Sequence, residues 1–151
     1  MEYACPVWDP HLEKDKGLLE GIQRKAARFI KGDFRTTSSV DAMLEDLGFK
    51  ELEKRRRDLR LALLFKIASG QVGVDPEDIG ITVADERTRA TNSHKFRELY
   101  KTPKTDVLKY SFTARSVRTW NTLPARIVEL DSPDAFKAEL SRLNLDAPKA
   151  P

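Results

Sequence analysis

Hydrophobic residues recur at helical spacing along much of this chain, most regularly between residues 51 and 69. Positions three, four and seven apart lie on the same side of an α-helix. In this segment they form two neighbouring stripes, one of Leu52, Leu59, Leu63 and Ile67 and the other of Leu61, Leu64 and Ala68. A helix that is apolar on two sides must be packed on more than one side. We therefore predict that residues 51–69 form the central helix of the core.

A long helix is predicted before the central one. Asp9 and Pro10 resemble an N-cap and a first helical position, so the pattern predicts a helix over residues 10–31. Gly32 follows the last apolar position of this helix and is expected to end it. The chain before the helix, residues 2–9, is expected to be extended, because it combines aromatic and β-branched residues with two prolines.

A short amphipathic helix is predicted between these two. Ser38 with Asp41 three residues later is an acidic variant of the capping box, and Gly48 marks the end of the apolar pattern. Three helices joined by short loops favour a compact bundle, because short connections force neighbouring helices to pack against each other.

The second half of the chain has a weaker pattern, and residues 73–114 are expected to form a loop-rich connector. Within it, residues 81–83 (ITV) predict a short strand, and the polar residues 84–94 predict a loop. We expect a turn of helix near Phe96 and an extended piece over residues 107–112.

Helical order is expected to return near the C-terminal end. Val117 and Trp120 lie three apart on a predicted short helix that Pro124 must terminate. Ser132 resembles an N-cap and opens a final predicted helix over residues 133–143. The expected fold class is therefore mainly α, a compact helical bundle with a loop-rich, partly extended second half.

Four regions follow from this pattern. Residues 1–72 are expected to form the helical bundle, residues 73–114 the connector, residues 115–145 a C-terminal helical segment and residues 146–151 a disordered tail. At 151 residues, the chain is long enough to bury a core without a metal or a disulfide.

Composition excludes several classes of protein. Cys5 is the one cysteine of the sequence, so the chain has no internal disulfide and no cysteine-based zinc site, which favours a reducing compartment. The sequence has no apolar run of membrane-spanning length and no start typical of a secretory signal. We therefore expect an intracellular protein, nuclear or cytoplasmic, without a membrane partner.

Motifs for catalysis are missing from the sequence. Two-metal polymerases and nucleases need converging carboxylates, and the nearest candidate is VADE at residues 83–86, which is not a paired acidic motif on a strand. The sequence has no phosphate-binding loop, no GxGxxG and no GxSxG. His11 and His94 are far apart in the sequence. We therefore predict no catalytic residue, no metal ligand and no cofactor, and we expect that the chain is not an enzyme.

Basic residues give the clearer functional signal, although the net charge is only +3. They gather in two clusters, one of Lys54, Arg55, Arg56, Arg57 and Arg60 and the other of Arg24, Lys25 and Arg28. Arrays of this kind bind nucleic-acid phosphates through charge-assisted hydrogen bonds and counterion release. Acidic residues are interleaved at Glu51, Glu53 and Asp58, so an ordinary salt-bridged surface fits the same residues. The residues alone leave both interpretations open.

Four stretches in order carry a family resemblance. They are EYACPVWDPHL, QRKAARFIKGDFRTTSSVDAMLEDLGF, ELEKRRRDLRLALLFKIASG and SFTARSVRTWNTLPARIVELDSPDAFKAEL. Together they resemble the C-terminal part of reverse transcriptases encoded by non-LTR retrotransposons of the jockey, CR1 and RTE type. The resemblance runs from Glu2 to about Leu143. It implies that the first half corresponds to the helical thumb, which grips template and primer, and the second half to the tail beyond it.

The resemblance also implies what this chain lacks. It begins after the place where the family's palm, with its metal-binding acidic pair, would end, which implies that this chain cannot polymerise DNA by itself. The basic residues named above would then face the phosphates of an RNA or DNA template-primer duplex.

A second hypothesis is a structural or protein-interaction domain without a nucleic-acid role. Tyr3, Val7 and Trp8 would pack on the palm in the full-length family. In this chain they must fold back, lie exposed or pair with another copy, so self-association through this N-terminal segment is a further expectation.

Overall fold

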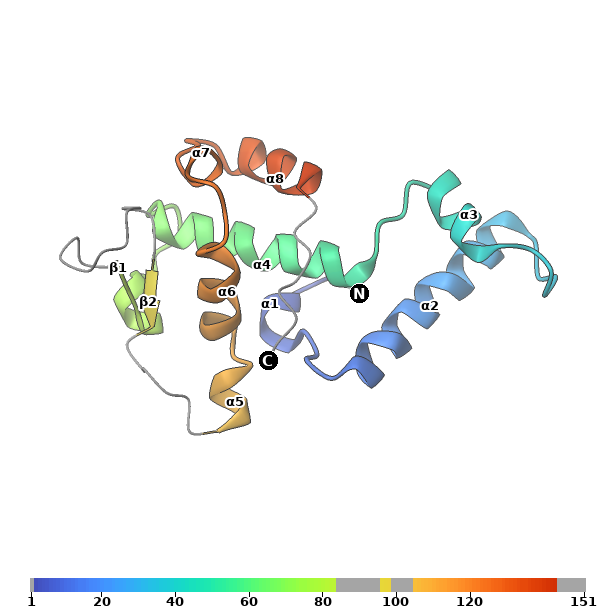
Figure 1. Ribbon diagram of the computed structural model, residues 1–151, viewed down its shortest axis with the longest axis horizontal. Coiled ribbons are helices and arrows are strands. Elements are labelled where there is room, and N and C mark those ends of the chain that lie inside the picture. The colour runs from blue at the N-terminus through green and yellow to red at the C-terminus, as the bar shows by residue number, and fades with distance from the viewer. Residues whose placement is uncertain (1, 84–95, 99–104, 144–151) are drawn as a thin grey trace. The chain divides into compact units, whose positions relative to one another are not determined.

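The structure, a computed structural model, describes residues 2–83, 96–98 and 105–143. Helices dominate these residues, which confirms the mainly α fold class (Figure 1). The chain divides into two compact units, Met1–Arg57 and Asp58–Pro151. This boundary lies inside the central helix α4 (Leu52–Ala68) and not at residue 72.

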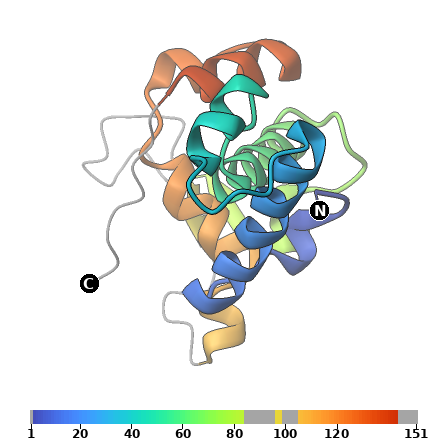
Figure 2. The same cartoon turned by 90° about the vertical axis from the view of Figure 1, so that its right-hand side faces the viewer.

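The first unit contains α1 (Cys5–Trp8), α2 (Glu13–Lys31), α3 (Val40–Asp46) and the beginning of α4. Helices α2 and α3 pack against each other, and the loop that joins them can be followed in Figure 2.

The N-terminal segment differs from its prediction. Cys5–Trp8 is helical and not extended, because Pro6 falls within the first two helical positions, where the missing N–H breaks no helical hydrogen bond. The expected start of α2 was also wrong, since the helix begins at Glu13 after an N-cap at Leu12 that makes no side-chain hydrogen bond. Asp9 instead lies at the C-cap of α1.

The connection between α2 and α3 begins and ends at well-defined caps. Gly32 has φ +62°, a left-handed conformation that suits glycine, and its N–H donates to the carbonyls of Arg28 and Phe29. The N-cap of α3 is Ser39, whose hydroxyl accepts a hydrogen bond from the backbone N–H of Ala42 at 3.3 Å. The predicted cap at Ser38 was therefore displaced by one residue, and the Ser38 hydroxyl donates to an Asp33 carboxylate oxygen at 2.7 Å.

The second unit is built around the C-terminal half of α4, as the two apolar stripes indicated. Helices α6 (Phe112–Trp120) and α8 (Pro133–Arg142) contribute to the same hydrophobic cluster. The fully buried or nearly buried members of the cluster are Leu61, Leu64, Phe65, Ile81, Val117, Trp120, Leu123, Ile127, Phe136 and Leu140. The rings of Phe65 and Phe136 stack with centroids 4.5 Å apart. This packing confirms α4 as the central helix of a core.

A two-stranded antiparallel sheet flanks this core. The strands are β1 (Ile81–Val83), as predicted, and β2 (Phe96–Glu98), where a turn of helix was expected. The side-chain amide of Asn121 pairs with the backbone of Phe96 in β2. It donates to the carbonyl of Phe96 and accepts from the N–H of Phe96, both at 3.0 Å, so these two strand groups are hydrogen-bonded. A short 3-10 helix, η1 (Pro76–Ile79), precedes β1.

Residues 105–130 contain three short helices, the first of which lies where an extended piece was expected. The elements are α5 (Asp106–Lys109), α6 and α7 (Ala125–Val128). Thr105 and Ser111 each accept a hydrogen bond from a backbone N–H three residues later, and these two caps start α5 and α6. Pro124 follows α6 and stands at the N-cap of α7, in agreement with its predicted role as a terminator.

Other expectations lie outside the described residues, namely the polar loop at residues 84–94 and the tail at residues 146–151. Within residues 2–83, 96–98 and 105–143, no helix is both long enough and apolar enough to cross a bilayer.

Candidate nucleic-acid interface

The cations at the start of α4 do not share one surface. Successive residues of a helix point about 100° apart, so Lys54, Arg55, Arg56 and Arg57 are spread around the whole circumference. Arg56 is 0% exposed and Arg60 is 5% exposed. The expectation that these two side chains face the phosphates of a duplex therefore fails in this structure, because a buried guanidinium cannot reach a polyanion at the surface.

Arg56 is held by a carboxylate from the N-terminal segment. Its Nε donates to Oδ1 of Asp9 at 2.7 Å, and both side chains are buried, at 0% and 4% exposure. A buried charge is costly unless it is paired, so this ion pair fixes the residues after α1 against the first turns of α4.

The neighbouring cations are also engaged within the protein. Arg55 forms an ion pair with Glu2, and its Nη1 donates to Oε1 of Gln23 at 3.4 Å. Lys54 and Arg57 are half-buried, and each has an interaction inside the protein. The acidic neighbour Glu53 binds Lys16 of α2 and not an arginine of α4. The salt-bridged interpretation thus describes this end of α4, with the acidic partners of Arg55 and Arg56 supplied by the N-terminal segment.

Helix α2 has three different sides, and its inner face contacts the start of α4. Gln23 is buried and donates from Nε2 to the carbonyl of Lys50 at 3.0 Å, and Glu20 accepts the backbone N–H of Glu53 at 3.1 Å. The Glu20 contact satisfies one of the unpaired N–H groups in the first turn of α4. Lys16 bridges Glu13 and Glu53 at 2.7 Å each. Burial alone would lower the pKa of Lys16, but these two carboxylates outweigh it and hold the pKa above its ordinary value.

A second side of α2 is basic. At 100° per residue, five cations fall within a sector of about 120°. This cationic face consists of Lys14, Arg24, Lys25, Arg28 and Lys31. A Cβ added at Gly17 or Gly21, which lie in the same sector, would meet nothing within 4 Å. The open space around Gly21 shows that it is not a site of close helix approach.

Three members of the cationic face bind groups near α3. Arg24 pairs with Asp41 at 2.5 Å, and Lys31 pairs with Asp46. Arg28 donates to the backbone carbonyls of Asp33, Arg35 and Ser38, at 3.4, 2.7 and 3.4 Å. Arg28 therefore organises the connection between the helices, whereas the ion pairs of Arg24 and Lys31 involve exposed carboxylates and are weak in water.

The two remaining residues of the cationic face, Lys14 and Lys25, form no such contacts among the described residues. Lys14 and Lys25 are exposed, and neither side chain has a hydrogen-bond or ion-pair partner among the described residues. Lys25 was predicted as a binding residue, but Lys14 was missed. The signal was present in the sequence, because the separation of 11 residues between them is close to three helical turns.

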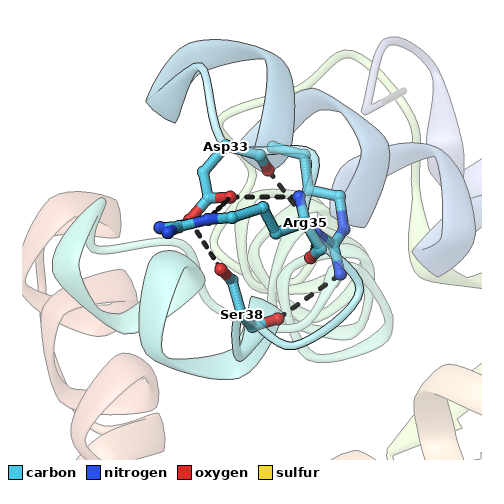
Figure 3. Close-up of polar contacts among 4 residues, drawn as sticks. Asp33, Arg35 and Ser38 are labelled. Carbon is cyan, nitrogen blue, oxygen red and sulfur yellow. Dashed lines mark hydrogen bonds and ion pairs between the residues drawn. The ribbon is translucent and has the colours of Figure 1, made fainter.

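The loop beside the cationic face is tied together by Asp33 (Figure 3). Its carboxylate accepts hydrogen bonds from the Arg35 side chain at 3.1 and 3.0 Å, from the backbone N–H of Arg35 at 3.1 Å and from the Ser38 hydroxyl at 2.7 Å. These bonds, with the Arg35 side chain foremost, hold the pKa of the Asp33 carboxyl well below its usual range. The same contact raises the pKa of Arg35.

Of the other candidates for chemistry named in the sequence, Cys5 and His11 are described by the structure, whereas His94 and residues 84–86 lie outside the described residues. Cys5 is 0% exposed, and Trp120 is 1% exposed, so Trp120 is a core side chain and its ring is not available for base stacking. The described residues contain no group of three or more His, Cys, Asp or Glu side chains placed to hold a metal ion. A depression of about 470 Å³ at α7 and α8 is lined by Arg126, Ile127, Leu130, Ala135, Ala138 and Glu139.

Comparisons with known proteins add no relative to this picture: no family model, no curated protein and no solved structure matches the chain. The resemblance to reverse transcriptases therefore stays a prediction from the sequence.

Proposed function

We propose that this chain is a non-catalytic nucleic-acid-binding helical module, as its resemblance to the thumb and tail of retrotransposon reverse transcriptases implies. The observation that carries the proposal is the cationic face of α2. Five cations lie along one side of this helix, over about 25 Å from Lys14 to Lys31 at 1.5 Å per residue.

The proposed contacts differ from those expected from the sequence. Lys14 and Lys25 bind phosphates directly, because their ammonium groups are exposed and have no partner among the described residues. Arg24 and Lys31 can exchange a surface carboxylate for a phosphate at small cost, since exposed ion pairs are worth about 0–1 kcal/mol. Arg56 and Arg60 are not part of the proposed interface, because they are buried.

A duplex suits this face because it presents a phosphate charge about every 1.7 Å along its axis, so several charges lie opposite the helix at once. Contacts of this kind give binding that tolerates sequence and weakens as salt is raised. The proposal includes RNA and DNA duplexes alike, since phosphates carry the contact.

Fluorescence anisotropy with a labelled RNA–DNA hybrid tests the proposal. The variant Lys14→Gln/Lys25→Gln should weaken binding and should reduce the slope of log affinity against log salt by about 2. The control Arg118→Gln/Arg126→Gln removes the same charge from exposed side chains that also have no partner in the described part of the chain. An equal loss in both variants would show that net charge alone matters and would refute an α2 interface.

A second candidate, a protein-interaction domain that self-associates, is favoured by the exposure of the N-terminal segment. Tyr3, Val7 and Trp8 are 93%, 88% and 41% exposed. Trp8 also donates from its indole N–H to the carbonyl of Tyr3 at 2.8 Å, which holds the apolar rings of this turn at the surface. Light scattering separates the two candidates, because a stable dimer that ignores duplexes would support the second.

A further inference from the structure

The third side of α2 is apolar and exposed. At 100° per residue it covers a sector of about 120°, between the cationic face and the inner face. We call this side the apolar face, and it consists of Leu18, Ile22, Phe29 and Ile30, which are 62%, 52%, 78% and 56% exposed. Helix α2 thus turns its polar Gln23 and small Ala27 inward and leaves these four large hydrophobic side chains outside, the reverse of an ordinary surface helix.

Large apolar side chains are also exposed next to both ends of the helix. Leu12 before α2 is 54% exposed, and Phe34 after it is 67% exposed. Large contiguous apolar surfaces are rare on monomeric proteins and commonly mark interaction sites. The spacing of Leu18, Ile22 and Phe29, at four and seven residues, is the anchor spacing of a helix that packs along another helix.

Charge at the edge of the apolar face indicates what kind of segment covers it. Lys14 and Lys25 border the edge next to Leu18 and Phe29, and neither has a partner among the described residues. The opposite edge, near Ile30, carries no carboxylate at the surface of α2. A partner helix that places acidic side chains along the lysine edge gains ion pairs there, while its own apolar stripe fills the face.

The same charges disfavour a second copy of this chain. In an antiparallel pair, each edge of a helix lies against the same edge of its partner, so Lys14 and Lys25 would face their own counterparts. In a parallel pair, Asp15, which lies within the apolar sector near its N-terminal end, would lie beside its own copy. Both arrangements bring like charges together, which costs stability.

From this placement we infer that the apolar face of α2 is a docking site for an amphipathic helix of another protein with acidic residues along one edge. The inference does not depend on nucleic-acid binding. Ile22 and Phe29, which supply the apolar contact, lie outside the cationic face. Substitutions can therefore abolish helix docking without changing the residues proposed to bind nucleic acid.

Synthetic helical peptides supply the probe. Three peptides of equal length share one Leu/Ile stripe and differ only in the residues beside it, which are Glu, Gln or Lys. Fluorescence anisotropy at low salt should show that the Glu peptide binds about two- to fivefold more tightly than the Gln peptide and that the Lys peptide binds most weakly. The Lys14→Glu/Lys25→Glu variant should reverse the order of the Glu and Lys peptides.

The apolar contribution is tested with Ile22→Gln/Phe29→Gln, which should lose at least about tenfold in affinity for the Glu peptide. Both side chains are exposed, so circular dichroism should show an unchanged fold, and binding of the RNA–DNA hybrid should also be unchanged. The matched control is Val107→Gln/Leu108→Gln, which removes two exposed apolar side chains of α5 and should bind the peptide normally.

Several outcomes would overturn the inference. Equal affinities for the three peptides, or full affinity in Ile22→Gln/Phe29→Gln, would remove its basis. A dimer that this double variant dissolves would identify a second copy as the occupant. Binding to phosphatidylserine vesicles that depends on Phe29 and exceeds peptide binding would identify a membrane surface instead.

Discussion

The ion pair between Asp9 and Arg56 offers the most direct test of how the first unit is held together. It joins residues 47 positions apart, and both side chains are almost completely inaccessible to water. The Nη1 and Nη2 atoms of Arg56 are also buried and have no hydrogen-bond partner among the described residues. Removal of the Asp9 carboxylate therefore leaves a buried cation without its compensating charge.

The expected loss follows from this geometry. Breaking a buried ion pair by removing one partner typically costs about 3–5 kcal/mol. Asp9→Asn should fall near the lower value, because the amide oxygen can still accept the hydrogen bond from Nε. Asp9→Ala should fall near the upper value, because it removes the charge and the acceptor together. Either loss is a large part of the stability of a domain of this size, which is commonly about 5–15 kcal/mol.

Urea unfolding followed by far-UV circular dichroism measures these losses. The double variant Asp9→Leu/Arg56→Met replaces both partners with apolar side chains. It should recover most of the stability lost in Asp9→Ala, because the attraction within a buried ion pair does little more than offset the cost of removing both charges from water. A double-mutant cycle between Asp9 and Arg56 then gives the coupling energy. A loss of less than about 1 kcal/mol in each single variant, or additive effects in the cycle, would refute a coupled buried ion pair.

The remaining predictions concern α2, its connection to α3 and the helix caps. Gly17→Ala and Gly21→Ala should each raise the free energy of unfolding by about 0.5–1 kcal/mol, because a Cβ at either position meets nothing within 4 Å; a lower urea midpoint would contradict this. Ser39→Ala should lower the free energy of unfolding by about 1 kcal/mol, because it removes the N-cap hydrogen bond of α3. Ser132→Ala should lower it less, because that side chain makes no cap hydrogen bond. Similar losses of the two variants in thermal unfolding would count against this explanation. Asp33→Asn should lower Tm near neutral pH. Because the pKa of Asp33 is depressed in the folded state, its stabilisation is present above its ordinary value of 3.8 and is lost as the pH falls below it. The Tm difference between Asp33→Asn and the natural protein should therefore shrink below about pH 4, and a difference that stays constant on acidification would exclude the proposed hydrogen bonds.

Local signals in the sequence were sufficient for several elements. The two apolar stripes of residues 51–69 predicted α4 within one residue at each end, and glycines at 32, 48 and 70 marked helix ends that the structure confirms with positive φ. The strand at residues 81–83 and the helix after Ser132 were also predicted correctly. Each of these features depends on residues a few positions apart, which is the range over which periodicity and capping act.

The candidate site depended on contacts that the sequence does not encode locally. The run from Lys54 to Arg57 looked like one basic cluster, yet Arg56 is buried against Asp9 and Arg55 pairs with Glu2. Conversely, Lys14 looked unremarkable by itself, although helical geometry places it with Lys25 on the cationic face.

The sequence by itself determined which residues share a side of each helix, because the helical repeat fixes those angles wherever the helix lies. Only the tertiary structure decided which side turns inward. The large apolar residues of α2 recur at the spacing of a packed face, whereas the structure buries Gln23 and Ala27 and exposes Ile22 and Phe29. The physical reason is that hydrogen bonds and ion pairs to the start of α4 select the inner face of α2, and those partners lie about 30 residues away in the sequence.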